Sequence, residues 1–179
     1  ASMIRSTFRT TYTILLAGTL ALFLAACGGG DTSDTGSDAA DSGESTTQQS
    51  GDVDREITLQ PQGNQIAYAT TELTAQAGET VRLVFENTAD SPAMVHNVLL
   101  LNSNDEEVIQ RVGTASQAAG EAEGYVPDDD AIIAYTPLAQ PGETVEMTFT
   151  APEEPGEYTY LCTYPGHWAI MQGTLTVEG

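Results

Sequence analysis

The chain has 179 residues, a length that predicts one domain of ordinary size with a tail. It contains 26 acidic residues and only five basic ones, all of them arginine, so its formal net charge is −21. Nucleic acid is excluded as a partner, because neutralising phosphates requires basic clusters that this sequence lacks. The strong negative charge favours association with a basic partner surface. The alternative is that it serves only to keep the protein soluble.

Residues 1–27 have the features of a bacterial export leader. Residues 1–3 are expected to be a cloning remnant before the natural start. Two arginines then precede an apolar run over residues 12–26, which is shorter than the roughly 20 residues that cross a membrane. Residues 24–28 (Leu-Ala-Ala-Cys-Gly) resemble a lipoprotein signal, which implies cleavage before Cys27 and a lipid on its sulfur. An uncleaved apolar anchor and an ordinary signal cut nearby are the alternatives.

Residues 28–52 are expected to form a flexible, acidic tether. They are rich in Gly, Asp, Ser, Thr and Gln, and contain no aromatic, large aliphatic or basic residue. Such a segment cannot bury enough apolar surface to become ordered. With a lipid on Cys27, the tether predicts a domain held on the extracytoplasmic face of a bacterial membrane.

From residue 53 onward the pattern changes to short strand-like runs separated by Gly- and Pro-containing turns. We expect strands over residues 55–60, 65–69, 72–75, 80–86, 94–102, 132–138, 144–150, 157–163 and 173–178. Residues 106–119 are expected to contain one or two helical turns. This pattern predicts that residues 53–179 form one all-β domain, a sandwich or barrel of about eight strands.

The chemistry of the sequence is concentrated near its C-terminus, in residues 158–173. Cys162, His167 and Met171 lie close together there, and the intervening Pro-Gly pair predicts a tight turn between two strands. Thiolate, imidazole and thioether are the ligands of blue-copper centres, which use two histidines, one cysteine and a weak axial methionine. The chain has one other histidine, His96, so we predict a site for one copper ion built from these four residues.

The pattern Cys-x₄-His-x₃-Met resembles the ligand loop of the azurin and auracyanin branch of the cupredoxins, and the pair His96-Asn97 resembles its upstream half. The resemblance covers about residues 54–179. It implies a Greek-key β-sandwich with a short helical insertion, and one copper ion cycling between Cu(I) and Cu(II). Two features depart from the azurin pattern: Val95 stands where azurins have glycine, and the azurin disulfide has no counterpart.

Further roles are assigned around the four ligands. Asn97 is expected to tie the His96 strand to the Cys162 loop, and Pro165 and Gly166 to hold that loop in shape. Residues around His167 are expected to form an apolar patch for brief docking of a redox partner: Tyr164, Trp168, Ala169 and Ile170. The alternative for Trp168 is burial in the core.

The expected function is one-electron transport outside the cytoplasm, without turnover of a substrate. The resemblance implies a quinol-oxidising complex as donor and a reaction-centre cytochrome or terminal oxidase as acceptor. A copper enzyme would need further histidines for a catalytic copper, and the chain has only two. Copper storage or delivery is the other alternative. A disulfide between Cys27 and Cys162 is formally possible, but each cysteine has a separate explanation.

Overall fold

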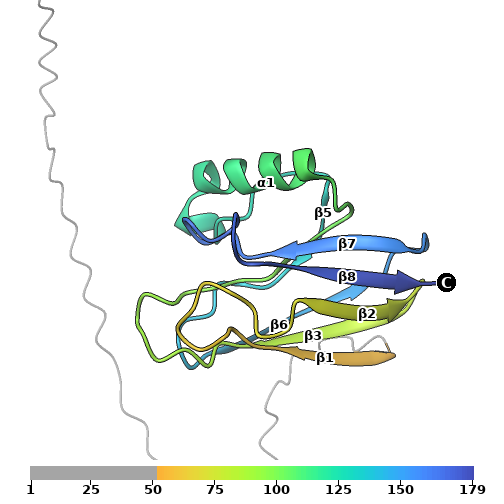
Figure 1. The fold of residues 1–179 in the computed structure, drawn as a ribbon, viewed down its shortest axis with the longest axis horizontal. Helices are drawn as coiled ribbons and strands as arrows, with labels where there is room; N and C mark the ends of the chain where they lie inside the picture. The colour runs from red at the N-terminus through yellow and green to blue at the C-terminus, as the bar shows by residue number, and fades with distance from the viewer. Residues whose placement is uncertain (1–51) are drawn as a thin grey trace, which may run out of the picture. The chain divides into compact units, whose positions relative to one another are not determined.

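The computed structural model describes residues 52–179, which form eight strands in two sheets and one α-helix (Figure 1). The predicted leader (1–27) with Cys27, and all but the last residue of the predicted tether (28–52), lie outside the described residues. The elements are β1 (Arg55–Leu59), β2 (Glu72–Gln76), β3 (Thr80–Glu86), β4 (Leu99–Leu101), α1 (Glu106–Ala119), the short 3₁₀-helix η1 (Glu121–Glu123), β5 (Ile132–Tyr135), β6 (Thr144–Thr150), β7 (Gly156–Leu161) and β8 (Gln172–Glu178). The predicted all-β sandwich with a helical insertion is confirmed. Neither helix in residues 52–179 has the length and apolar character that crossing a membrane requires.

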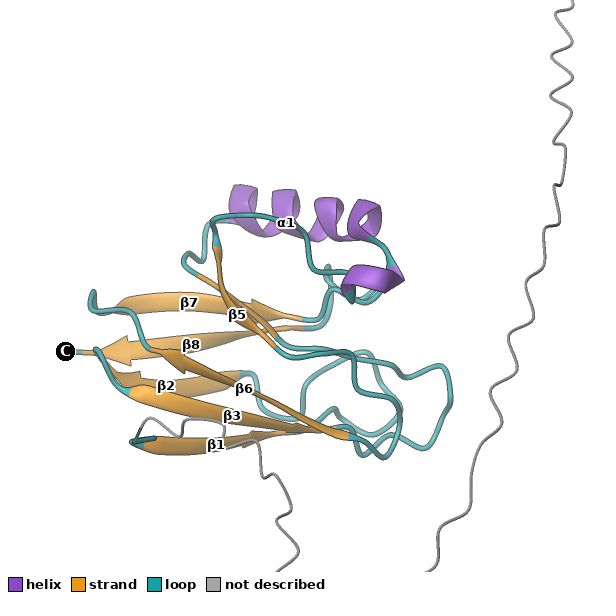
Figure 2. Ribbon diagram, turned by 180° about the vertical axis from the view of Figure 1, so that it is seen from behind, coloured by secondary structure: helices purple, strands orange, loops and turns teal. Residues whose placement is uncertain are grey.

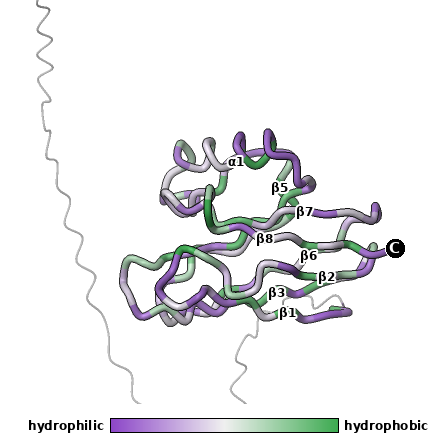
Figure 3. Tube along the Cα trace, viewed as in Figure 1, coloured by the Kyte–Doolittle hydropathy of each residue, from purple (hydrophilic) through white to green (hydrophobic). Residues whose placement is uncertain are grey.

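The smaller sheet has the strand order β1-β3-β6, with β1 parallel and β6 antiparallel to β3. Along β3 every second side chain is buried, namely Val81, Leu83 and Phe85, because alternate residues of a strand face opposite sides of the sheet. Figure 3 shows hydrophobic and hydrophilic residues alternating along this sheet. The alternation in the sequence predicted β3 and β6 with their observed bounds.

The larger sheet has the order β2-β8-β7-β4-β5 and is covered on both faces at β4 and the second half of β7. Leu100 and Tyr160 belong to the main core between the two sheets, whereas Leu99, Leu101 and Leu161 pack in a second cluster with α1. Coverage on both faces explains why β4 reads as an uninterrupted Leu-Leu-Leu run instead of an alternating one.

Helix α1 lies outside the larger sheet, over β7 and β5 (Figure 2). Its buried residues are spaced as one helical stripe: Ile109, Val112, Gly113 and Ser116. Two glutamates in the first turn suit the positive end of the helix dipole. The helix has 14 residues, so it is longer than the one or two turns predicted, because the Ala-containing stretch up to residue 119 continues it.

Three predicted strands differ clearly from the structure, one of them the strand predicted over residues 132–138, which ends at Tyr135 as β5. The strand predicted at residues 65–69 is wrong: Tyr68 forms only an isolated bridge, and the residues before it turn. The strand predicted over residues 94–102 shortens to β4. Its first half leaves the sheet because His96 pairs with Ala139, at 3.2 and 2.7 Å in the two directions.

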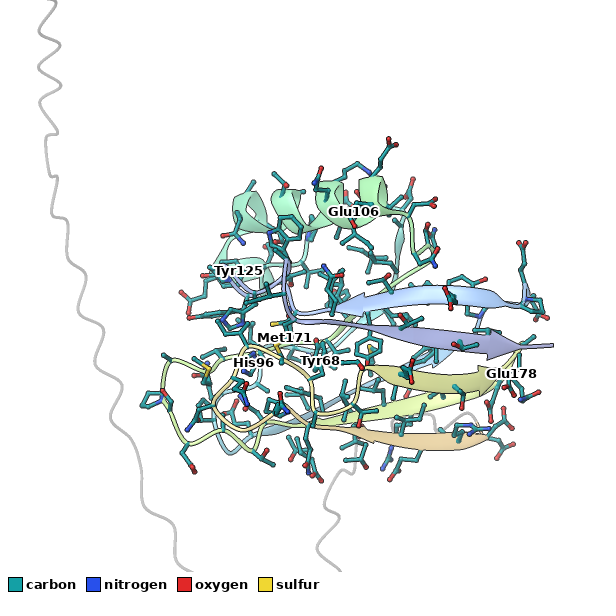
Figure 4. The ribbon with its side chains drawn as sticks, viewed as in Figure 1. Tyr68, His96, Glu106, Tyr125, Met171 and Glu178 are labelled. Atoms are coloured by element: carbon teal, nitrogen blue, oxygen red, sulfur yellow. The ribbon has the colours of Figure 1, made fainter. Side chains whose placement is uncertain are left out.

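The two ends of the sandwich differ in what they carry. The backbone N–H of Asp54 donates to the carbonyl of Thr80 (2.9 Å), so the described chain enters at the end where β3 starts. The C-terminus lies at this same end, which we call the terminal end (Figure 1). His96 and Met171 lie toward the other end, the loop end, whereas Glu178 lies at the terminal end (Figure 4).

Gly173→Ala is predicted to destabilise the fold. Gly173 pairs with Tyr160 across β7 and β8, and a Cβ at residue 173 would overlap the tyrosine ring. That ring is 1 % exposed and its hydroxyl donates to the carbonyl of Thr70 (2.7 Å), so it cannot move aside freely. We expect urea unfolding to show a loss of about 1–3 kcal/mol.

The matched control is Gly156→Ala in the neighbouring strand β7, where the new Cβ would meet nothing closer than 3.8 Å. Its effect should stay within about 0.5 kcal/mol. Equal losses in the two variants would show that contact with Tyr160 is not the cause.

Candidate metal centre

Three metal-binding side chains converge in the loop end of the sandwich. The sulfur of Cys162 lies 3.5 Å from Nδ1 of His167 and 3.8 Å from Nδ1 of His96. One ligand atom from each residue lies within 4.8 Å of the other two. All three residues are buried, His167 retaining 4 % exposure. The fold thus brings together His96 and Cys162, which are 66 residues apart.

The loop after β7 is shaped by backbone hydrogen bonds within residues 164–171. A turn closes with the N–H of His167 donating to the carbonyl of Tyr164 (2.9 Å), and Pro165 and Gly166 occupy its two central positions. Gly166 has φ 83°, which a type II turn requires at this position. The N–H of Met171 then donates to the carbonyl of His167 (2.8 Å).

Met171 ends this loop next to the ligand cysteine. The N–H of Cys162 donates to the carbonyl of Met171 (3.0 Å), and both residues are fully buried in the same core cluster. The predicted axial donor therefore lies beside the three converging ligands. Figure 4 shows Met171 and His96 both at the loop end of the sandwich.

His96 is fixed by a residue that sequence reasoning missed. Asn87, 1 % exposed, donates from Nδ2 to the carbonyls of Met94 (2.7 Å) and Ala139 (2.9 Å), and Ala139 is the bridge partner of His96. A polar residue after a strand is usually part of an exposed loop. The only feature of the sequence that could have indicated a structural role for Asn87 is its position directly after the strand predicted at 80–86.

Asn97 connects the two segments that carry the ligands. Its Oδ1 accepts from the N–H of Thr163 (2.8 Å), and its Nδ2 donates to the Thr163 hydroxyl (2.8 Å) and to the carbonyl of Gly124 (3.2 Å). The buried hydroxyl of Tyr68 donates to the carbonyl of Asn97 (2.8 Å). Because Thr163 directly follows Cys162, these bonds fix the cysteine relative to the histidine that precedes Asn97.

Burial keeps all three ligands uncharged in the absence of a cation. It raises the pKa of the Cys162 thiol to about 12, although backbone N–H groups of Asn97 and Tyr164 act in the opposite direction. Burial, and then repulsion from His167, lower the pKa of His96 to about 4, and burial also lowers the pKa of His167. The imidazoles are therefore neutral donors near pH 7, and a bound cation would replace the thiol proton.

The donor set fits one type 1 copper ion. Metal–nitrogen and metal–sulfur bonds of about 2.0–2.3 Å meeting at about 120° would separate donor atoms by about 3.6 Å. The observed sulfur-to-nitrogen distances are 3.5 and 3.8 Å. The second ring nitrogen of His96 is buried and has no hydrogen-bond partner among the described residues, so no competing contact there turns the ring away from the site. Thiolate, two imidazoles and a thioether are the ligands of this copper class.

The four residues predicted to dock a partner differ in exposure. Ile170 is 64 % exposed and Ala169 is also exposed, whereas Tyr164 and Trp168 are half-buried. The ring of Tyr164 lies 5.0 Å from that of His167. The open part of this patch is therefore formed by residues 169 and 170.

Comparison with known proteins agrees with this geometry. The family model of copper-binding proteins of the plastocyanin/azurin family matches residues 55–178. Auracyanin-A of Chloroflexus aurantiacus is 42 % identical over 160 residues, which are 89 % of this chain and 91 % of that protein. An azurin of Pseudomonas aeruginosa is 35 % identical over 130 residues, or 69 % of this chain and 86 % of that protein.

Solved structures are similar over the same region. Auracyanin A, a "blue" copper protein of Chloroflexus aurantiacus, matches with a TM-score of 0.64 and 42 % identity, covering 69 % of this chain and 98 % of that one. Reduced auracyanin of Roseiflexus castenholzii matches with a TM-score of 0.64 and 36 % identity, covering 69 % and 97 %.

The copper-free protein is predicted to lose stability in mild acid. The pKa of His96 is about 4 in the folded state, below its ordinary value of 6.5, so the unfolded chain binds a proton first. Stability from this group is complete above about pH 6.5 and falls as the pH drops toward about 4, by up to about 3 kcal/mol. Urea unfolding at several pH values measures this, and His96→Gln should flatten the profile. An unchanged slope in the variant would assign the effect to other groups.

Asn97→Ala is predicted to loosen the centre. It leaves the N–H of Thr163 and the carbonyl of Gly124 without their partner, which should cost at least about 2 kcal/mol in urea unfolding. Copper should also be lost faster to a chelator. The control is Asn102→Ala, which removes an exposed bond to the carbonyl of Asp130 (3.2 Å) and should cost no more than about 0.5 kcal/mol. Similar losses in both variants would refute a special role for Asn97.

Proposed function

The chain belongs to the plastocyanin/azurin family of copper-binding proteins, and from this we propose that it is a one-electron carrier with a single type 1 copper centre. The observation that carries the proposal is the convergence of the Cys162 sulfur and one ring nitrogen each of His96 and His167 within 4.8 Å. Met171, buried beside them, is the proposed axial donor. Copper bound there would supply the Cu(II)/Cu(I) couple.

The residues of the chain would make that couple fast by staying in place. Cys162 and His96 are fully buried, so little water has to rearrange when the charge of the site changes. The loop is fixed before any ion is bound, by the turn at Pro165 and Gly166 and by the hydrogen bond from the N–H of Cys162 to the carbonyl of Met171. The proposed path for the electron leaves through His167, the only one of the four proposed ligands that keeps any exposure, at 4 %.

The protein is a carrier and not an enzyme. A copper enzyme of the nitrite reductase or multicopper oxidase kind needs a second copper bound by additional histidines. Both histidines of the full chain belong to the proposed centre.

We further propose that the domain works outside the cytoplasm, anchored through a lipid on Cys27 and the acidic tether over residues 28–52. The described chain enters at the terminal end, so the point of attachment to any preceding segment lies at the end of the sandwich opposite the copper centre. Redox proteins would dock on the patch of Tyr164, Trp168, Ala169 and Ile170, and the net charge of −21 favours a basic partner. By family resemblance, a quinol-oxidising complex would be the donor and a reaction-centre cytochrome or terminal oxidase the acceptor.

The copper-loaded protein is predicted to show intense visible absorption and a narrow copper hyperfine splitting in its EPR spectrum, and to be reduced reversibly. Cys162→Ser should abolish the visible band while the fold is retained. Copper that binds without these signals, or that cannot be reduced reversibly in place, would favour storage or delivery instead.

Met171→Leu should keep the colour and raise the reduction potential, because losing the weak axial donor destabilises Cu(II) more than Cu(I). We expect the reduction potential to rise by more than about 59 mV, which corresponds to a tenfold change in the equilibrium constant of a one-electron reduction. Met147→Leu is the matched control, since Met147 is a buried core residue of β6 that is not among the proposed ligands. Equal shifts in both variants would exclude Met171 as the axial ligand.

A further inference from the structure

Helix α1 contacts the metal-binding loop at a position where the helix has no side chain. Gly113 lies on the buried face of α1, and a Cβ placed there would overlap the indole of Trp168. Trp168 directly follows the ligand His167 and packs in the cluster beneath α1 with Ile109 and Val112. The indole is therefore seated in a notch of the helix that only glycine leaves open.

A second contact from the same helix reaches the other end of the loop. The hydroxyl of Ser116, fully buried, lies 2.8 Å from the carbonyl of Gly113 and 3.4 Å from the carbonyl of Thr163. Thr163 directly follows the ligand Cys162. Helix α1 thus contacts the loop next to two of its three proposed ligands, Cys162 and His167, and the two contacts are one helical turn apart.

We propose that α1 acts as a clamp on the metal-binding loop, and that Gly113 and Trp168 are positioning residues for His167. Within the loop, the backbone of His167 is held by hydrogen bonds of its own turn, to Tyr164, Ile170 and Met171. The seated indole adds a contact with a separate element, and Nε2 of Gln172 holds the Trp168 carbonyl (2.6 Å). The clamp keeps Nδ1 of His167 at its distance from the Cys162 sulfur, 3.5 Å. This inference rests on the copper centre proposed above.

The test is a double-mutant cycle between Gly113→Ala and Trp168→Ala in the full chain. With Trp168 present, the added methyl should displace the indole, lower the melting temperature, shift the copper absorption band and hyperfine splitting, and slow electron self-exchange. With Trp168 removed, the same methyl has room, and alanine is the better helix former, so the melting temperature should rise and the spectra should not change further. Trp168 is the only tryptophan of the chain, so its fluorescence reports the displacement directly.

Two further variants separate positioning from general destabilisation. Gly156→Ala, at the terminal end, makes only ordinary contacts and should leave the copper spectra as in the unaltered protein. Ser116→Ala removes the hydroxyl contact with Thr163 without adding an atom, so the variant should fold. It should shift the copper spectra less than Gly113→Ala does. Should Gly113→Ala prevent folding, Trp168→Phe supplies the spectral test, because its smaller ring leaves the notch partly empty.

The outcomes distinguish the clamp from the copper assignment. If Gly113→Ala has the same effect in both tryptophan backgrounds, or leaves absorption and EPR spectra unchanged, the clamp is wrong. If the unaltered protein shows no type 1 spectrum, the proposed function fails. In that case the melting temperatures of the copper-free cycle still decide whether α1 and the loop are coupled.

Discussion

The reciprocal hydrogen bonds between Asn97 and Thr163 are the interaction on which the centre depends. They join two segments 66 residues apart, each of which carries one ligand beside the bonded residue. Neither segment is held there by a long strand: β4 begins only at Leu99, and β7 ends at Leu161. A pair of buried side chain bonds replaces the sheet ladder at the point where the ladder has to open to admit an ion. The donors are thus arranged before any ion is bound.

That arrangement has a cost in the absence of copper. A thiol and two imidazoles are desolvated together, and the pKa of Cys162 rises while those of the histidines fall. All three shifts favour neutral ligands, which can neither be well solvated nor pair with one another strongly. A cation that displaces the thiol proton removes this conflict, so the groups that weaken the empty fold are those that stabilise the occupied one. The rest of the sandwich has to be stable enough to tolerate the centre, and its two cores supply that stability.

The local parts of this structure could be predicted from the sequence, but the contacts between distant parts could not. Alternation fixed the bounds of β3 and β6, and the spacing of Cys162, His167 and Met171 around a Pro-Gly turn identified the donor set. The strand predicted at 65–69 is wrong because these residues form a loop in which only Tyr68 is buried, where its hydroxyl donates to the Asn97 carbonyl. Asn87 was missed because a buried amide and an exposed one look alike in a sequence. The notch at Gly113 is equally invisible there, since glycine in a helix ordinarily signals weakness.

The same reasoning explains why the loop end can be both open and stiff. A loop that exposes Ala169 and Ile170 to a partner would ordinarily be mobile, because exposed loops have few contacts to restrain them. Here the loop is restrained by contacts with the rest of the fold. Met171 is buried in the core, Thr163 is hydrogen-bonded to Asn97, and Trp168 packs beneath α1. These three contacts are made with different parts of the fold and do not involve Ala169 and Ile170, the exposed part of the docking patch. An electron carrier needs both properties at one place, a surface for brief encounters and a ligand set that does not move, and this division among the residues of one short loop provides them.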